Sequence, residues 1–363
     1  MSKGFMVFIC FCSLLNAEDI RITLSTDKTD YKLGDLIKLK LLIENTSNET
    51  KTVNIPVLDN RSVFFGFKYK EDGNKLRTYY PEPSKEKVST MKDLADLIDF
   101  YAKNKIVRDE QFIIELGDFP IPEMLKSKAI ETKVLKPNDK IEGEISIYAI
   151  RAGHTKVVAY YTDHIENAGL WVFKRYLVSN PVEIDIIGKS IQVRMETDNG
   201  ELELKLLPDL ALNHAYHFFK LCKEGFYEKT YFHRIIKGFM VQGGDPNSKD
   251  DDPENDGLGG PNYLLPSEIS DAKHVNGILS MARTAFFNSA GSQFFIVTEA
   301  YTKEDKDRQA NLNGKYTIFG EIVKGGKSSK TLYQLSKTPS DLDDNGKVKE
   351  RVYIKKTEVI INY

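Results

Sequence analysis

The sequence predicts a mainly β protein with two domains in succession, and three observations support this. The chain has 363 residues, more than one ordinary domain holds and enough for two. Short runs in which apolar and polar residues alternate dominate residues 18–187, and a period of two is typical of strands. At Gly188 the pattern restarts with two alternating runs around a turn. We therefore expect domains at 18–187 and 188–363.

Composition and charge narrow the class of protein. Hydrophobic residues make up 41% of the chain and charged residues 29%, which allows ordinary cores and argues against disorder. Lys and Arg together number 51 and Asp and Glu 53, so the net charge is −2. This leaves no basic excess to neutralise phosphates, and we expect no nucleic-acid partner.

Residues 1–17 are typical of a signal peptide. Lys3 supplies a positive start, residues 5–15 form an apolar run too short to span a bilayer as a helix, and Ala17 is a plausible last residue before cleavage. No later stretch approaches 18 uninterrupted apolar residues. We expect an exported protein, periplasmic or secreted.

The cysteines fit this interpretation. Cys10 and Cys12 lie in the signal segment, so the mature chain keeps only Cys222 and forms no intrachain disulfide. Cys222 is expected as a small buried hydrophobe. A lipid anchor on Cys10 or Cys12 is an alternative that would bring the protein to a membrane, although small residues do not precede either cysteine.

The first domain is predicted to be an antiparallel β-sandwich of immunoglobulin-like type, because short strands alternate with polar turns. The phrase DYKLGD at residues 30–35, followed by an alternating strand, resembles immunoglobulin-like repeats of exported bacterial proteins. The cysteine pair of antibody domains is absent. The expected strands are residues 20–24, 37–43, 141–147, 155–161, 170–178 and 182–186.

A helical insertion is predicted within this domain, at about residues 84–130. The period changes over residues 85–104, and Ser84 or Ser89 could cap a helix there. The apolar face would consist of Met91, Leu94, Ala95, Ile98 and Tyr101.

The second domain begins with a predicted hairpin. Residues 191–197 and 202–206 alternate, and Asn199-Gly200 between them suits the positive φ angles of a type I′ turn. A helix should follow over residues 209–223, ended by Gly225 in a left-handed C-cap.

Four blocks of the second domain carry its chemistry. They read FYEKTYFHRIIKGFMVQGGD at residues 226–245, NGILSMAR at 276–283, SAGSQFFI at 289–296 and LNGKYTIFG at 312–320. In content and order they resemble the cyclophilin-type peptidyl-prolyl cis-trans isomerases over about residues 190–362. The resemblance implies an eight-stranded antiparallel β-barrel capped by helices. It also implies proline-containing segments of unfolded or exported proteins as partners.

The residues of these blocks suit rotation about an X-Pro bond. Alternation along neighbouring strands can bring a guanidinium, an amide and large apolar groups together. The bond rotates slowly because amide resonance imposes a barrier of about 18–20 kcal/mol. No bond is broken, so we expect neither metal nor cofactor. An apolar cup for the proline ring and a hydrogen bond to the prolyl nitrogen in the twisted state would lower the barrier.

The family's site residues transfer to matching positions. The resemblance implies that Arg234 donates to the prolyl nitrogen, that Gln242 positions Arg234 and the substrate backbone, and that Phe239 lines the proline pocket. Further substrate-binding residues are expected in the pocket and along the groove for the residue before proline: Met240, Phe295, Leu312 and Tyr316, then Ala282, Arg283 and Gln293.

Two positions depart from the family's pattern. Asn311 stands where many members carry a tryptophan, and Tyr316 stands where they carry a histidine. The tyrosine ring can still close the pocket. Without the tryptophan, strong binding of cyclosporin is not expected.

Other polar groups near the motif are predicted to be structural. Isomerisation needs no proton transfer, so His233 is not expected as a base. His214 and His217 make an unconvincing metal pair without a third ligand. Residues 248–257 are interpreted as a solvated acidic loop and residues 301–310 as a charged rim loop beside the pocket.

Three hypotheses about function remain open. The leading one is an exported prolyl isomerase that assists folding, with the sandwich as tether, client-binding arm or dimerisation element. The second is an adhesion or interaction protein that binds proline-containing peptides without catalysis. The third is a sandwich that holds unfolded clients by itself. The sequence does not indicate an oligomeric state.

Overall fold

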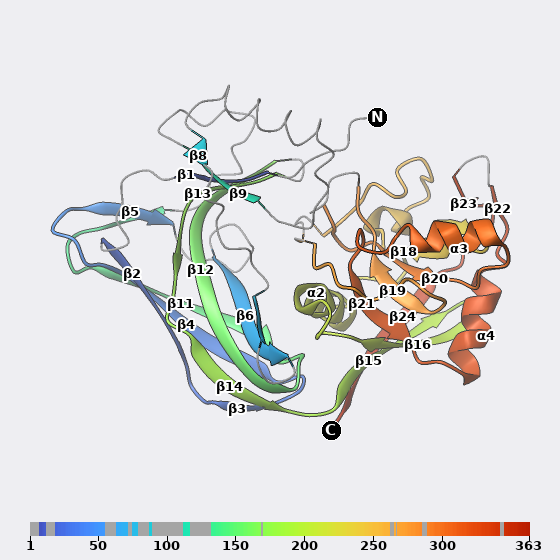
Figure 1. Cartoon of the computed structure of the whole chain (residues 1–363), viewed down its shortest axis with the longest axis horizontal. Coiled ribbons are helices and arrows are strands. Elements are labelled where there is room, and N and C mark those ends of the chain that lie inside the picture. The colour runs from blue at the N-terminus through green and yellow to red at the C-terminus, as the bar shows by residue number, and fades with distance from the viewer. Residues whose placement is uncertain are drawn as a thin grey trace. The chain divides into compact units, whose positions relative to one another are not determined.

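The computed structural model describes residues 7–11, 19–54, 63–71, 75–78, 87–88, 112–116, 132–167, 170–261, 265, 267–284, 289–341 and 345–363. The chain divides into two compact units, Met1–Ile187 and Gly188–Tyr363 (Figure 1). The division falls at Gly188, where the alternating pattern restarts.

The described part of the first unit is built from strands. They are β1 (Val7–Phe11), β2 (Ile20–Thr26), β3 (Asp30–Lys32), β4 (Leu36–Asn45), β5 (Lys51–Asn54), β6 (Val63–Glu71), β7 (Lys75–Thr78), β8 (Lys87–Val88), β9 (Phe112–Leu116), β10 (Thr132–Leu135), β11 (Lys140–Tyr148), β12 (Gly153–Asn167), β13 (Leu170–Val178) and β14 (Val182–Ile187). The main sheets are β3-β14-β12-β13-β1-β9-β8, which β6 and β7 extend from β12, and β11-β4-β2.

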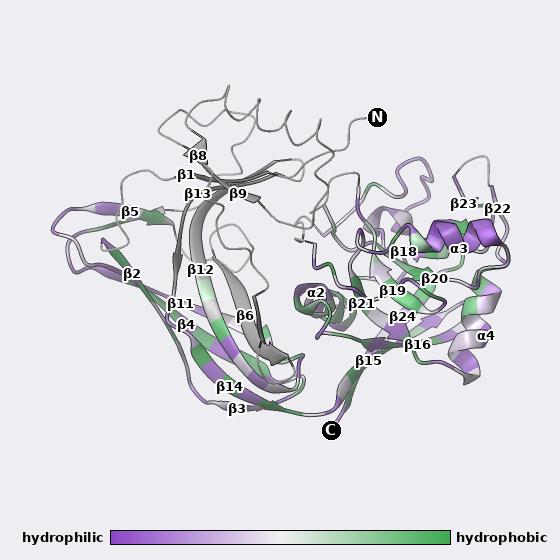
Figure 2. Cartoon of the chain, in the orientation of Figure 1, coloured by the Kyte–Doolittle hydropathy of each residue, from purple (hydrophilic) through white to green (hydrophobic). Residues whose placement is uncertain are grey.

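Alternation decides which face of these strands is buried. Along β4, every second residue from Ile37 to Ile43 is buried, and its neighbour β2 follows the same pattern. Figure 2 shows the matching alternation of hydrophobic and hydrophilic residues along these strands. The unit is not purely antiparallel as expected, because β14 pairs with β3 in parallel and β1 pairs with β9 and β13 in parallel. Its immunoglobulin-like type stays a prediction.

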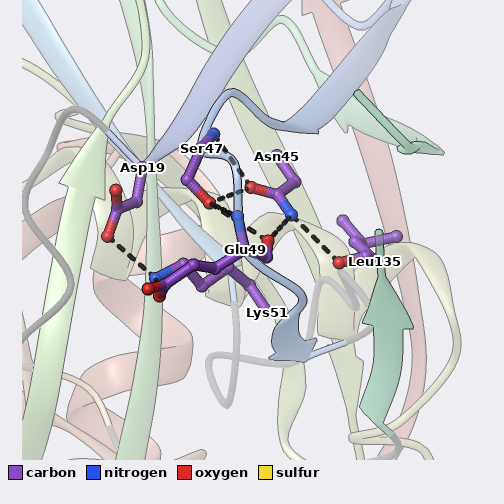
Figure 3. A network of polar contacts seen from close by, with 6 residues as sticks. All are labelled: Asp19, Asn45, Ser47, Glu49, Lys51 and Leu135. Carbon is purple, nitrogen blue, oxygen red and sulfur yellow. Dashed lines mark hydrogen bonds and ion pairs between the residues drawn. The ribbon is translucent and has the colours of Figure 1, made fainter. Parts of the chain in front are cut away.

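A polar network joins the loops at one end of this unit (Figure 3). The buried side chain of Asn45 donates to the carbonyls of Glu49 and Leu135, at 2.7 and 3.0 Å, and its Oδ1 accepts from Ser47. Nearby, Lys51 forms ion pairs with Asp19 and Glu49. Because every polar atom of the Asn45 amide is engaged, the network fixes the β4–β5 loop against β10.

Most of the predicted insertion lies outside the described residues. This includes the expected helical face of Met91, Leu94, Ala95, Ile98 and Tyr101 and the caps Ser84 and Ser89. The parts described within residues 84–130 are strands β8 and β9. The signal segment is described only at residues 7–11, as the backbone of β1, so its cleavage stays a prediction.

The second unit is one sheet with helices. Its elements are β15 (Ser190–Thr197), β16 (Gly200–Leu206), α2 (Leu212–Lys223), β17 (Arg234–Ile236), β18 (Met240–Gly243), η2 (Pro246–Lys249), β19 (Ile278–Met281), β20 (Phe294–Val297), α3 (Lys303–Ala310), β21 (Ile318–Ile322), α4 (Gly326–Leu335), β22 (Ser340–Asp341), β23 (Lys347–Val348) and β24 (Ile354–Asn362). In the described residues of this unit, ten strands run in the order β22-β23-β17-β18-β20-β19-β21-β16-β15-β24.

The strand count differs from the expected eight because the two-residue strands β22 and β23 are added beside β17. Backbone hydrogen bonds also connect the segment before β17 with the segment before β24, from Lys229 to Ile354, Ile354 to Thr230 and Phe232 to Val352. Closure of the sheet into a barrel stays a prediction.

The hairpin β15–β16 forms where expected, but its turn is shifted by one residue. Thr197 pairs with Gly200, so Asp198 and Asn199 are the loop residues and the predicted type I′ turn at Asn199-Gly200 is wrong. Gly200 alone has a positive φ there, +124°. Thr197 Oγ1 decides the register, because it accepts from the Asn199 N–H and donates to the Gly200 carbonyl.

One face of the sheet packs on an aromatic core beneath α2. Phe218 of α2 contacts Phe294 of β20 and Phe319 of β21 at ring distances of 5.4 and 5.1 Å. Tyr227 contacts both Phe218 and Phe294. These rings are fully buried, and such pairs contribute about 0.5–1.5 kcal/mol each beyond burial. Helix α2 and strands β20 and β21 are therefore joined through one buried aromatic core.

Helix α2 ends as predicted but begins three residues later. At its end, Gly225 has φ +68°, and the Gly225 and Phe226 N–H groups donate back to Cys222 and Leu221 in a Schellman motif. Its N-terminus has no local side-chain cap.

A distant carboxylate caps α2 instead. Glu268 accepts from the backbone N–H groups of Asn213 and His214, and its Oε2 lies 2.6 Å from Nδ1 of His214. Glu268 and His214 are both buried. A negative group at a helix N-terminus is favourable, and this one decides where α2 begins.

Two further expectations from the sequence concern Cys222 and membrane-spanning helices. Cys222 is buried, and burial raises the pKa of its thiol well above the ordinary value. Within the described residues, no helix is long and apolar enough to cross a membrane.

We predict that Glu268→Ala destabilises the second unit by about 2–4 kcal/mol, because it leaves buried N–H groups and a buried imidazole without their acceptor. Urea unfolding of the full chain, followed by NMR signals of residues 188–363, measures this. Glu254→Ala is the matched control, since Glu254 is 81% exposed and an exposed ion pair such as the one with Lys347 contributes little to stability. Equal stability of the two variants would refute the capping role.

His233 gives the second unit a dependence on pH. Its side chain is buried, and this burial, together with the charge of Arg234, lowers the pKa of His233, while Asp245 and Asp256 oppose the shift. The imidazole is therefore neutral in the folded unit near pH 7, whereas the unfolded chain takes up a proton below about pH 6.5.

We predict that the free energy of unfolding of the second unit is highest above about pH 6.5 and falls as the pH drops through the depressed pKa of His233. The contribution of one histidine cannot exceed about 1.4 kcal/mol per pH unit. His233→Phe removes the titrating group, so the decline between pH 7 and 5 should be shallower, as urea unfolding at each pH would show. Identical slopes for the two proteins would contradict this role.

Candidate active site

The pairing of three strands places the predicted catalytic side chains in one row. Arg234 of β17 lies opposite Gln242 of β18, and Gln242 lies opposite Phe295 of β20. Directly paired residues share a face of the sheet. The parallel row two residues along consists of Ile236, Met240 and Val297. The guanidinium, the amide and the apolar groups therefore occupy the face opposite to that of Phe294 and the aromatic core.

The predicted pocket residues form one apolar cluster on that face. Met240, Phe295 and Leu312 are buried at its centre, together with Val297. Phe239, Ala282 and Tyr316 are half-buried and pack against it, as do Ile236 and Ile278. The structure thus brings together residues from four separate blocks of the sequence.

Arg234 is held beside this cluster by oxygens of the chain itself. Its Nη1 donates to Oε1 of Gln242 at 3.2 Å, its Nε to the Asn345 carbonyl at 2.8 Å and its Nη2 to Oδ1 of Asn345 at 2.8 Å. Partial burial lowers the pKa of Arg234 somewhat, and an arginine at such a site stays protonated near pH 7. The site therefore contains a fixed positive charge and N–H donors next to apolar side chains.

Gln242 is in turn oriented by a relay. Its Nε2 donates to Oε1 of Gln293 at 3.0 Å, and Nε2 of Gln293 donates to the carbonyls of Gly257 and Gly259, both at 2.9 Å. Because an amide has distinct donor and acceptor ends, this chain leaves Oε1 of Gln242 to accept from Arg234. This chain of hydrogen bonds supports the predicted role of Gln242 in positioning Arg234.

Phe239 lies in the turn between β17 and β18, and helix α3 anchors that turn. Nε2 of Gln309 donates to the carbonyls of Gly238 and Thr298, at 3.0 and 2.9 Å, and the Arg308 guanidinium lies 5.5 Å from the Phe239 ring centre. Residues 301–310 are thus mostly helix, not the rim loop expected. Thr302 and Asp305 form a capping box, the sequence signal that would have revealed it. The helix is hydrophilic along its length (Figure 2).

Tyr316 is held in place on two sides. Its ring meets Phe295 edge-on at 5.7 Å, and the Arg283 guanidinium lies 4.6 Å from its centre. Nε and Nη2 of Arg283 both donate to the Lys315 carbonyl, at 3.0 and 2.8 Å. Arg283 therefore holds Tyr316 on the side that Phe295 leaves open.

His274 supports the site through its contact with Phe295, and the sequence analysis did not predict this residue. Its buried ring stacks on Phe295 at 6.0 Å, while Nδ1 lies 3.1 Å from Asn313 Oδ1 and Nε2 lies 3.0 Å from Ser280 Oγ. Burial is the main cause that lowers the pKa of His274, so the ring is neutral near pH 7. No local signal marks this residue, because its partners come from other strands and loops.

The acidic segment after β18 closes one edge of the site. It begins with η2 and is tied to the segment around β23 by the ion pairs Lys347–Glu254 at 2.7 Å and Arg351–Asp251 at 3.4 Å. Its end supplies the Gly257 carbonyl to Gln293. The described residues contain no cluster of three His, Cys, Asp or Glu side chains suited to a metal ion.

The sequence of the second unit is similar to those of known proteins. Residues 192–359 match the family described as cyclophilin type peptidyl-prolyl cis-trans isomerase/CLD. The peptidyl-prolyl cis-trans isomerase of Synechococcus elongatus is 42% identical over 130 residues, which cover 36% of this chain and 79% of that protein. Peptidyl-prolyl cis-trans isomerase B of Bacillus subtilis is 38% identical over 137 residues, covering 37% of this chain and 85% of that protein.

A solved structure is also similar. A cyclophilin type peptidyl-prolyl cis-trans isomerase of Cryptosporidium parvum aligns with a TM-score of 0.39 and 32% identity, covering 48% of this chain and 99% of that one. The identity of the relatives and their coverage decide the classification. Through its second unit, the chain belongs to the cyclophilin-type peptidyl-prolyl cis-trans isomerases.

Proposed function

We propose that the second unit catalyses X-Pro isomerisation with Arg234 as hydrogen-bond donor to the prolyl nitrogen of the twisted state. The observation that carries the proposal is the held guanidinium of Arg234, which lies in one row with Gln242 and Phe295 beside the apolar cluster. Among the described residues, two of its five N–H groups, one on each terminal nitrogen, remain beyond the three bonds to Gln242 and Asn345.

The selectivity of this donor for the twisted state follows from the amide itself. In the planar amide the nitrogen lone pair is delocalised and accepts hydrogen bonds poorly. As the bond twists, the lone pair localises on nitrogen, and a donor then stabilises the transition state more than the ground state. A donor that is already fixed reorganises little during the reaction, which is why preorganised donors are effective.

The apolar cluster would bind the proline ring. The contacts would come from buried and half-buried apolar side chains, which suit the apolar ring: Phe239, Met240, Phe295, Leu312 and Tyr316. Ala282, Arg283 and Gln293 would flank the residue before proline. The relay from Gln293 to Gln242 joins this edge of the site to Arg234.

The cellular role that fits best is assistance to the folding of exported proteins. The apolar run of residues 5–15 and Ala17 support export, and a prolyl isomerase accelerates a slow folding step of other chains. The first unit would then serve as tether, client-binding arm or dimerisation element.

We predict that Arg234→Ala lowers kcat/KM for an Ala-Pro test peptide by about 10²–10³-fold with little change in KM, the effect of losing a donor that acts in the transition state. A protease-coupled or NMR exchange assay on the full chain measures this. Arg194→Ala is the matched control, because Arg194 lies in β15 in ion pairs with Glu201 and Glu358. If Arg234→Ala is as fast as Arg194→Ala, Arg234 is not the donor and the proposal fails. If the full chain binds the peptide without accelerating its isomerisation, the chain is the non-catalytic binder.

We predict that the chain expressed in a bacterium with a cell envelope is found outside the cytoplasm with Glu18 as its first residue. Cleavage after Ala17 places the small side chain at the −1 position. Mass spectrometry of the exported fraction identifies the N-terminus. A cytoplasmic, uncleaved chain would overturn the export proposal, and a diacylated Cys10 or Cys12 would favour the lipid anchor.

A further inference from the structure

Among the described residues, Asn345 accepts the most hydrogen bonds from the Arg234 guanidinium. Its backbone carbonyl accepts from Nε, and its side-chain Oδ1 accepts from Nη2, both at 2.8 Å. The two oxygens engage one edge of the guanidinium as the two oxygens of a carboxylate would. Gln242 engages the remaining terminal nitrogen, so the plane of the guanidinium is defined from both ends.

The backbone of Asn345 is shaped for this contact. Asn345 has φ +51° and Gly346 has φ +86°, so two successive residues lie in the left-handed region. Asparagine is one of the few residues besides glycine that tolerate this region. The turn brings the carbonyl and Oδ1 of Asn345 to the same side of the chain, toward Arg234.

The turn is also locked onto strand β17. The Ile235 N–H donates to the Gly346 carbonyl at 2.8 Å, the Gly346 N–H donates to the Asp341 carbonyl at 2.7 Å, and Lys347 pairs with Arg234. A Cβ on Gly346 would lie 2.7 Å from Cγ1 of Ile236 and 2.8 Å from the Ile235 carbonyl oxygen, so only glycine fits. The two acceptor oxygens of Asn345 are therefore fixed in position relative to β17, the strand that carries Arg234.

We propose that Asn345 is a positioning residue for isomerisation, which holds the Arg234 guanidinium so that its remaining N–H groups face the prolyl nitrogen. This inference rests on the proposed function of Arg234. A long arginine side chain loses considerable rotamer freedom when it is fixed, and acceptors that are already in place offset this loss before substrate arrives.

Three variants of the full chain separate positioning from a purely structural role. Asn345→Gly keeps the left-handed backbone and the carbonyl that accepts from Nε, and removes only Oδ1. Asn345→Asp restores an oxygen at that position and tolerates the same φ. Asn138→Gly is the matched control, because Asn138 also has a positive φ, +68°, in an exposed turn of the first unit.

We expect Asn345→Gly to lower kcat about tenfold with KM within about twofold, the size of one lost hydrogen bond to a charged group. Asn345→Asp should recover the rate to within about threefold, and Asn138→Gly should match the wild type. The Nη2–H resonances of Arg234, whose acceptor Oδ1 is removed, should exchange faster with solvent in Asn345→Gly than in the other two variants.

A double-mutant cycle supplies the decisive comparison. If Asn345 acts through Arg234, Asn345→Gly should change the residual rate of Arg234→Ala by less than about twofold. An equal tenfold loss in both backgrounds would overturn the inference, as would a wild-type rate for Asn345→Gly or a failure of Asn345→Asp to restore activity. A fast Arg234→Ala would instead refute the proposed function, so the two failures are distinguishable.

Discussion

The site depends on oxygens that hold a single guanidinium. An arginine side chain is long and flexible, and its charge alone does not direct it toward one place. In this protein β17 pairs with β18 on one side and with β23 on the other, so acceptors reach Arg234 from both neighbours. Gln242 comes from the first, and Asn345 from the turn before the second. The short strand β17 is therefore the point where the catalytic geometry is set.

One face of the sheet packs into the hydrophobic core, and the opposite face carries the residues of the site. Phe294 packs into the aromatic core with Phe218, while its neighbour Phe295 faces the site. Since successive residues of a strand point to opposite faces, each strand contributes to both at once. A closely packed core resists deformation, so the side chains on the other face keep their positions. His274 and Tyr316 extend this support to Phe295 from outside the row.

Segments that could pass for appended loops are structural parts of the site. Gln309 of α3 holds the turn that presents Phe239, and the end of the acidic segment holds Gln293 through the Gly257 and Gly259 carbonyls. Buried or partly buried carbonyls need donors, and these amide side chains supply them. Differences in such segments between members of the family would therefore change the edges of the site as well as its surroundings.

The sequence by itself determined the first two strands of the second unit and the end of α2 at Gly225, and the resemblance of its motifs predicted the apolar and polar site residues. These follow from periodicity, from the freedom of glycine at positive φ and from motifs that lie close together in the chain. The tertiary structure decided where α2 begins, since Glu268 reaches it from 54 residues away, and which oxygens hold Arg234, since Asn345 lies 111 residues along the chain. It also decided the register at Gly200 and the place of His274 behind Phe295. Local patterns constrain the backbone near them, whereas contacts at such separations exist only after the strands have paired.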